Sequence, residues 1–234
     1  MPAVYARDTG STSGSAPPIA PCYSDPMLIV PLEPARAEIL VTNSRFIASL
    51  APADTAEAAR TYIAGIRHEF PDATHHVPAF ILGGGNATTE YCSDDGEPSG
   101  TSGRPLLAVL KGSGLGNVVA VVTRYFGGTL LGTGGLVKAY TEAGKAVLAV
   151  VRRAALVETH RISVTLPYHL FDRARIILAD SGAVVVSEDF AEDVKLVVDV
   201  ACDEYLQFEA RLSEISSGTA RPRIESTRMA PRPL

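Results

Sequence analysis

The 234-residue sequence contains no tryptophan, only three cysteines and no long apolar run. The cysteines, Cys22, Cys92 and Cys202, are far apart and include no C-x-x-C pair, which excludes a disulfide framework and a zinc knuckle. No run approaches the roughly 18 apolar residues of a membrane-spanning helix, and the amino-terminal residues lack the apolar stretch of a signal peptide. We therefore expect a cytoplasmic protein with no membrane partner.

Positive charge is also in short supply. Lysine and arginine number 21 against 26 aspartates and glutamates, which gives a net charge of -5. A general nucleic-acid coat would need a basic surface, so this class is disfavoured, while a local basic groove stays open. The hydrophobic fraction of 46% and the charged fraction of 20% are typical of a globular protein. The length suffices for two domains.

Composition divides the sequence into three parts. Residues 1–24 are rich in Ser, Thr, Gly, Pro and Ala without periodicity, which predicts a disordered tail. Residues 25–153 are predicted to form a first domain that holds most of the glycine. Residues 154–234, where glycine is sparse, are predicted to form a smaller second domain.

Hydrophobic periodicity predicts a mixture of strands and helices in the first domain. Residues 38–50 are typical of two short strands joined near Thr42 and Asn43, or of one bent strand. A helix is expected over residues 55–69, with Asp54 as its N-cap. The apolar run 117–126 predicts a buried strand, and the spacing after it predicts a helix with Thr133 as its N-cap.

The second domain shows a strand-helix-strand-strand-helix-strand order. This order is the split βαββαβ pattern of ferredoxin-like domains. One of its predicted strands, VKLVVDVA, lacks the aromatic residues with which an RNA-recognition motif stacks on bases. We therefore expect no direct base readout by this domain and no sequence-specific DNA binding.

Fourteen of the 20 glycines lie between Gly83 and Gly135, around SDDGEPSGTSGRPLL and VVTRYFGGTLLGTGGLVKAY. These two stretches, together with SRFIASL and PDATHH upstream, resemble the signature of the YigZ/Impact family, the UPF0029 group. The resemblance covers about residues 38–150. The carboxyl-terminal part is similar to the small domain that accompanies bacterial members.

The resemblance implies an α+β architecture. Its first domain would be similar to domain 2 of ribosomal protein S5, and its second would be a ferredoxin-like domain similar to one of elongation factor G. Eukaryotic Impact proteins are translational regulators, so the family implies the ribosome, RNA or a translation factor as partner. It implies no reaction, and we expect a binding protein rather than an enzyme.

Three carboxylates, Asp94, Asp95 and Glu97, fall within four positions. Like charges this close need a cation, a helix N-terminus or water to offset them. One interpretation is a hard metal ion such as Mg²⁺, which would make all three candidate metal ligands and catalytic residues. The other is a solvated acidic turn whose carboxylates accept hydrogen bonds from local amides. The candidate cations within the chain are Arg104, Lys111, Arg124 and Lys138.

A glycine-led helix start is the second candidate site. Backbone amides at a helix N-terminus lack partners and attract anions, although the glycines could instead serve only close packing. The spacing fits neither a P-loop nor a dinucleotide fingerprint. The candidate residues for binding a ligand or anion are Arg124, Tyr125, Gly127, Gly128, Gly132, Thr133, Gly134, Gly135 and Lys138.

His75 and His76 are the only adjacent histidines. Neighbours on a strand point to opposite faces, so the pair is not expected to share a metal. His75 is a candidate catalytic base, and the alternative is a structural histidine bonded to the backbone.

Two functions stay open at this point. The first is a translation-associated or stress-related regulatory binding protein that uses residues 93–140 as its contact surface. The second is a metal-assisted enzyme for a phosphate-bearing or other anionic small molecule, with Mg²⁺ as its cofactor. An enzyme would gather the carboxylates and the helix start around one concave pocket. A binding module could instead carry them on separate or convex surfaces. Every role assigned to a side chain requires the acidic turn and the helix start to be neighbours in the fold.

Overall fold

The computed structural model describes residues 28–84 and 87–234, so the predicted tail over residues 1–24 lies outside the described part of the chain. Five antiparallel strands form the sheet of the first domain, in the order β2-β3-β6-β4-β5. The central strand β6 is buried on both faces, which explains its continuous apolar sequence. The strands are β2 (Ala35–Val41), β3 (Ser44–Pro52), β4 (His75–Gly84), β5 (Ala87–Cys92) and β6 (Val118–Tyr125).

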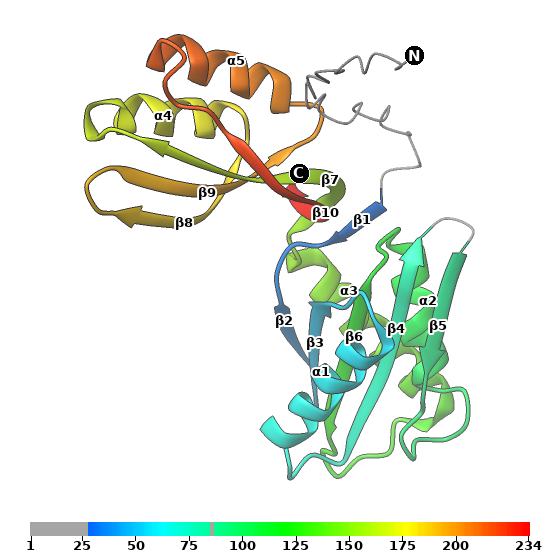
Figure 1. The fold of residues 1–234 in the computed structure, drawn as a ribbon. Coiled ribbons are helices and arrows are strands. Elements are labelled where there is room, and N and C mark those ends of the chain that lie inside the picture. The colour runs from blue at the N-terminus through cyan, green and yellow to red at the C-terminus, as the bar shows by residue number, and fades with distance from the viewer. Residues whose placement is uncertain (1–27, 85–86) are drawn as a thin grey trace, which may run out of the picture.

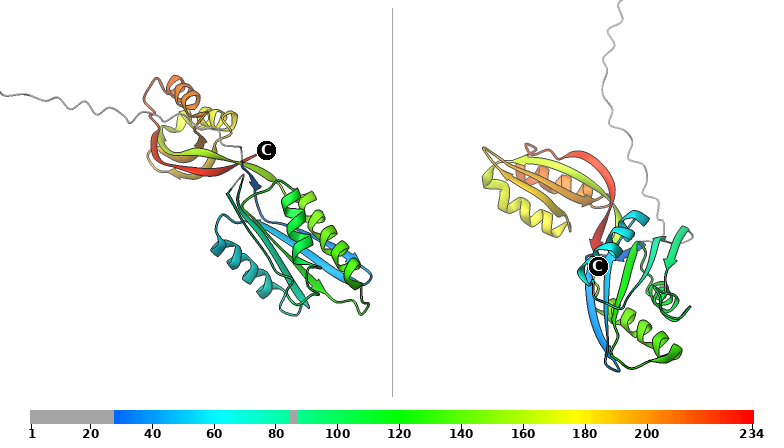
Figure 2. Two further views of the ribbon diagram at one scale, coloured as in Figure 1. Left: turned by 90° about the vertical axis from the view of Figure 1, so that its right-hand side faces the viewer. Right: turned by 90° about the horizontal axis from the view of Figure 1, so that it is seen from below.

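Helices cover both faces of this sheet (Figure 1 and Figure 2). Alternate residues of each strand point to opposite faces, so one face packs against α1 through Phe80 and Val119. The other face packs against α2 and α3 through residues such as Phe46 and Val122. The helices are α1 (Ala56–Glu69), α2 (Gly103–Gly112) and α3 (Gly132–Val150).

The predicted pair of strands over residues 38–50 is confirmed as the β2–β3 hairpin. Its two turn residues, Thr42 and Asn43, have positive φ angles of 43° and 63°. Positive φ at both central positions is the geometry that suits the twist of a tight hairpin.

Two helix starts differ from the prediction. Thr55, not Asp54, caps α1, because its Oγ1 accepts a hydrogen bond from the Ala58 amide at 3.1 Å. Both residue types are good caps, and the turn geometry decides between them. α3 begins at Gly132, which has a φ of 67°, and Leu131 occupies its N-cap without a side-chain bond. Thr133 therefore lies inside the first turn rather than capping it.

The second domain has the predicted ferredoxin-like topology. Its antiparallel strands lie in the order β10-β7-β9-β8, and α4 and α5 pack on one face of the sheet around a core that includes Ile162, Leu196 and Phe208. Among the described residues, no helix covers the opposite face of this sheet (Figure 1). The elements are β7 (Arg153–Leu166), α4 (Tyr168–Asp180), β8 (Val184–Phe190), β9 (Val194–Ala201), α5 (Tyr205–Ser216) and β10 (Arg223–Pro233).

A short strand, β1 (Leu28–Pro31), contacts both domains. It pairs with the first four residues of β7, next to the predicted boundary at residues 153 and 154. It also reaches the first domain, where the Gly116 amide donates to the Ile29 carbonyl at 2.9 Å. Among the described residues, no helix is long and apolar enough to cross a membrane.

Candidate functional site

The candidate residues lie at one end of the first sheet. β4 begins there at His75 and β6 ends there at Tyr125, and the register places His75 directly beside Arg124. Phe46 on β3 lies on the other side of Arg124. The acidic segment after β5 runs across this end, and each of its three carboxylates makes a different set of contacts.

Asp94 holds the start of α2. Its carboxylate accepts hydrogen bonds from the amides of Gly100, Ser102 and Gly103 at 2.8, 3.1 and 2.9 Å, and from the Ser102 hydroxyl at 2.8 Å. Burial alone would raise the pKa of Asp94, but these bonds favour the charged form and hold the pKa below its ordinary value. A side chain at Gly103 would collide with the Ser93 carbonyl, so only glycine allows this close approach.

Asp95 joins the same segment to β4 and to α1. Its Oδ2 accepts from the His76 amide at 2.7 Å, and its Oδ1 pairs with the Arg67 guanidinium on α1. Its carbonyl accepts from Nδ1 of His75 at 2.7 Å. Asp95 adopts a φ of 48°, in the left-handed region that aspartate tolerates better than most residues.

Glu97 is the buried member of the group, with 3% of its side chain exposed. Its Oε1 accepts from Nη1 of Arg124 at 2.6 Å and from the Tyr140 hydroxyl of α3 at 2.7 Å. Burial and the adjacent Glu97 carboxylate both raise the pKa of Tyr140 far above its ordinary value, so the phenol stays a hydrogen-bond donor. We call Glu97, Arg124 and Tyr140 the buried polar cluster.

Arg124 is enclosed by aromatic rings. Its guanidinium carbon lies 5.4 Å from the ring centre of Phe46 and 5.6 Å from that of Phe126, within the range of cation–π attraction. Its Nε is buried and has no hydrogen-bond partner among the described residues. Of the four candidate cations, Arg124 is thus the one that pairs with Glu97, whereas Lys111 pairs with Glu90.

His75 is oriented by the backbone. Its Nδ1 donates to the Asp95 carbonyl, and its Nε2 lies 3.9 Å from Oε1 of Glu97. Nε2 of His76 points elsewhere and lies 3.0 Å from the Phe70 carbonyl. The two histidines therefore serve different parts of the structure, as their alternation predicts.

The acidic segment is engaged by the protein itself. Asp94 bonds to α2, Asp95 to α1 and β4, and Glu97 to β6 and α3. Within residues 28–84 and 87–234, no three histidine, cysteine or acidic side chains are arranged to hold a metal ion. The three carboxylates thus connect five elements of the first domain to one loop.

The glycine-rich loop beyond β6 has a different environment. Gly127 lies against the Asn43 backbone with no room for a side chain, and its amide donates to Ser44 Oγ at 3.2 Å. Further along, Gly128, Gly132, Thr133, Gly134 and Lys138 are exposed. Apolar side chains of this loop are exposed as well: Leu130 is 87% exposed and Phe126 is 45% exposed.

The acidic segment and α3 are in contact, but not at the first turn of the helix. Glu97 meets the helix at Tyr140, eight residues after Gly132 and therefore about 12 Å along its axis. Within the described part of the chain, Gly134 and Lys138 form no hydrogen bond or ion pair with the three carboxylates, and both are exposed. The sequence did not single out Tyr140, although a buried tyrosine needs a partner for its hydroxyl and Glu97 was available in the acidic segment.

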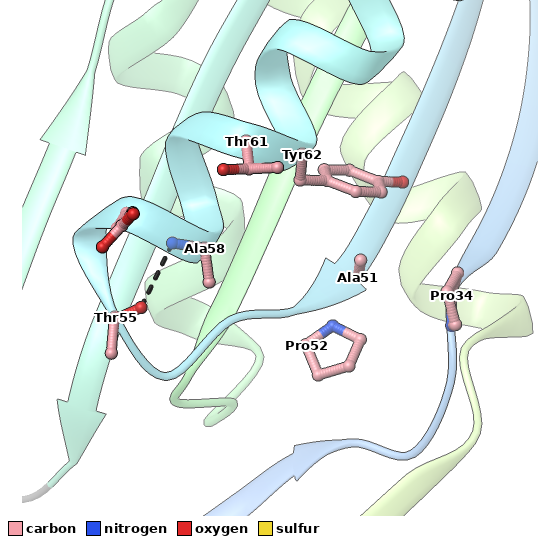
Figure 3. Close-up of a pocket in the computed structure, with 8 residues that line it drawn as sticks. Pro34, Ala51, Pro52, Thr55, Ala58, Thr61 and Tyr62 are labelled. Atoms are coloured by element: carbon pink, nitrogen blue, oxygen red, sulfur yellow. Dashed lines mark hydrogen bonds between the residues drawn. The ribbon is translucent and has the colours of Figure 1, made fainter.

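Two hollows in the described part of the chain lie away from these residues. The larger, of about 590 Å³, is an open depression between the end of β3 and the start of α1 (Figure 3), lined by Pro34, Ala51, Pro52, Thr55, Glu57, Ala58, Thr61 and Tyr62. A smaller one, of about 60 Å³, lies in the second domain beside Asp199.

Comparison with known proteins divides the chain as the fold does. Residues 42–148 match the Impact N-terminal domain, and residues 164–219 match a domain of unknown function, DUF1949. The IMPACT family member YigZ of Escherichia coli is 36% identical over 192 residues, which cover 82% of this chain and 94% of that protein.

Two solved structures extend the comparison. One, described only as a hypothetical protein, is 35% identical with a TM-score of 0.54 and covers 85% of this chain and 97% of its own. The other is the two-domain translational regulator Yih1, which is 22% identical with a TM-score of 0.32 and covers 58% of this chain and 54% of its own. The second similarity is too low to carry an argument.

Proposed function

The chain belongs to the IMPACT family, and from this premise we propose that it is a cytoplasmic regulatory protein that acts on translation through its glycine-rich segment, Ser93–Tyr140. In this proposal the segment contacts the ribosome, RNA or a translation factor. The part played by translation follows from the family resemblance of the sequence motifs. The choice of surface follows from the contacts of the segment.

The proposal rests on the observation that the two halves of the segment make different contacts. Its first half, with Asp94, Asp95 and Glu97, is committed to internal bonds and leaves no carboxylate free for a substrate. Its second half exposes Leu130 and Phe126 beside backbone rich in glycine. A rigid base under an exposed apolar loop suits a contact surface better than a reaction centre.

Co-sedimentation with purified bacterial ribosomes tests the proposal. The full-length protein should pellet with ribosomes at low salt, and Leu130→Ser should weaken this association by about tenfold, because it removes the most exposed apolar side chain of the loop. Leu206→Ser is the matched control, since Leu206 is 62% exposed on α5 in the other domain. Equal retention of both variants in the pellet would refute the proposed surface.

A second candidate function is the enzyme for an anionic small molecule. One observation favours it: the buried Nε of Arg124 has no partner among the described residues and could receive an anion at this end of the sheet. Thermal shifts with inorganic phosphate and with nucleotides, each with and without Mg²⁺, test this function. A rise in Tm that Arg124→Lys abolishes, in a protein that does not bind ribosomes, would favour the enzyme.

A further inference from the structure

The second domain has an open sheet edge at β8. Within the described residues, β8 pairs with β9 on one side and with no strand on the other (Figure 1). All seven of its residues, VVVSEDF, are exposed, and Val184, Val185 and Val186 keep 48%, 43% and 43% of their surface in solvent. An unpaired edge of this kind presents backbone donors and acceptors to an added strand.

Acidic residues accompany this edge. Glu188, Asp189, Glu192 and Asp193 fall within six positions at the β8–β9 hairpin, and all four are exposed. None of them forms an ion pair within residues 28–84 and 87–234. Residues 155–234 carry 13 acidic against 9 basic side chains, so the hairpin holds almost a third of the acidic groups in this part of the chain.

Aromatic rings border the same hairpin. Tyr168 and Phe190 are each 51% exposed, and their ring centres are 6.4 Å apart. The Tyr168 hydroxyl donates to the Ala191 carbonyl at 2.8 Å, which holds the ring beside the hairpin turn. An adjacent ring already makes a cation–π contact, because the guanidinium carbon of Arg175 lies 5.7 Å from the ring centre of Phe171.

We propose that β8 and its acidic hairpin bind an extended, basic segment of another protein by adding it to the sheet as a further strand. The open backbone edge would supply the hydrogen bonds, the valines an apolar contact, and the carboxylates and rings the preference for arginine or lysine. This surface is separate from the glycine-rich segment, so the inference does not depend on the proposed function.

A second copy of the chain is the main alternative occupant of the β8 edge. Antiparallel pairing of two β8 strands would bring Glu188 and Asp189 of each copy close to those of the other, and such like charges oppose association. The same carboxylates would attract a basic strand, so we propose a basic segment rather than a second copy of the chain.

Synthetic peptides test the inference on the full-length protein. The chain has no tryptophan, so a tryptophan at the end of each peptide reports binding by its fluorescence. An octapeptide that alternates arginine with valine should bind at least tenfold tighter than one that alternates glutamate with valine. Its affinity should also exceed that of a peptide that alternates arginine with proline, which has the same charge but cannot pair with a strand.

Variants and amide chemical shifts test where on the protein the peptide binds. Glu188→Lys should weaken the arginine–valine peptide about fivefold, because it reverses a charge at the edge, while Glu214→Lys on α5 makes the same change of net charge and should alter affinity less than twofold. Amide shifts in ¹⁵N spectra should centre on residues 184–190.

Three results would overturn the inference. The first is equal binding of the arginine–proline peptide, which would reduce the effect to charge alone. The second is a shift pattern centred outside β8. The third is concentration-dependent dimerisation that protects the β8 amides, which would assign the edge to a second copy.

Discussion

Both domains contain a buried carboxylate paired with arginine, but the arginines of the two sites differ in their exposure to solvent. In the first domain, Glu97 and Arg124 keep only 3% and 6% of their side chains exposed. In the second, Asp199 is equally enclosed at 7%, yet its partners Arg161 and Arg228 are 28% and 47% exposed. The first site is a buried ion pair, and the second is a buried anion with solvated cations.

The difference in burial predicts a difference in consequence. A buried ion that loses its partner cannot turn to water, so breaking the pair leaves an uncompensated charge. An exposed arginine that loses its partner is rehydrated at little cost. The first domain should therefore depend on its pair far more than the second does.

The largest effect is expected from Arg124→Ala. Among the described residues, this change leaves the buried Glu97 with the Tyr140 hydroxyl as its hydrogen-bond donor, and should lower the free energy of unfolding by about 3 kcal/mol or more. Urea unfolding at pH 7 measures it. Arg161→Ala is the matched control, because Asp199 then keeps Arg228. Similar losses of unfolding free energy in the two variants would contradict the expected difference between the two ion-pair sites.

A middle-sized effect is expected from Asp94→Asn. The amide can replace only part of the acceptor capacity that Asp94 offers to four donors, so the variant should lose about 2 kcal/mol at pH 7. The pKa of Asp94 is lower in the folded protein than in the unfolded chain, so its contribution is present above about pH 4 and is lost as the pH falls through the folded value.

The pH dependence supplies the measurement. The difference in unfolding free energy between wild type and Asp94→Asn should be largest near pH 7 and should shrink steadily below pH 4. Asp193→Asn, at an exposed carboxylate of the β8–β9 hairpin, should show no such trend. A constant difference across this range would mean that the charge of Asp94 is irrelevant to its bonds.

Local and periodic features of the fold were accessible from the sequence. The β2–β3 hairpin follows from two apolar runs around Thr42 and Asn43, and the ferredoxin-like domain follows from the order of its strands and helices. The N-cap of α1 was not, since adjacent Asp54 and Thr55 are both favoured N-cap residues and tertiary geometry chooses between them.

The site shows the same limit more sharply. Asp94, Asp95 and Glu97 are neighbours in the chain and invite a common role, yet they bond to different elements. Which carboxylate meets which partner depends on how the loop crosses the end of the sheet. That crossing depends on the φ of Asp95 and on the contact of Gly103 with Ser93, and neither has a periodic signal.

The smallest effect is expected from Asp199→Asn, and salt makes it diagnostic. Two arginines hold the pKa of Asp199 below its ordinary value although burial opposes this, but both are partly solvated, so the loss should be about 1 kcal/mol. At 1 M NaCl the Debye length falls to about 3 Å, and this loss should become still smaller. The loss caused by Arg124→Ala should hardly change, because salt does not reach the buried polar cluster. Urea unfolding of both variants at low and high salt therefore separates the two sites, and equal salt sensitivity would show that burial is not what distinguishes them.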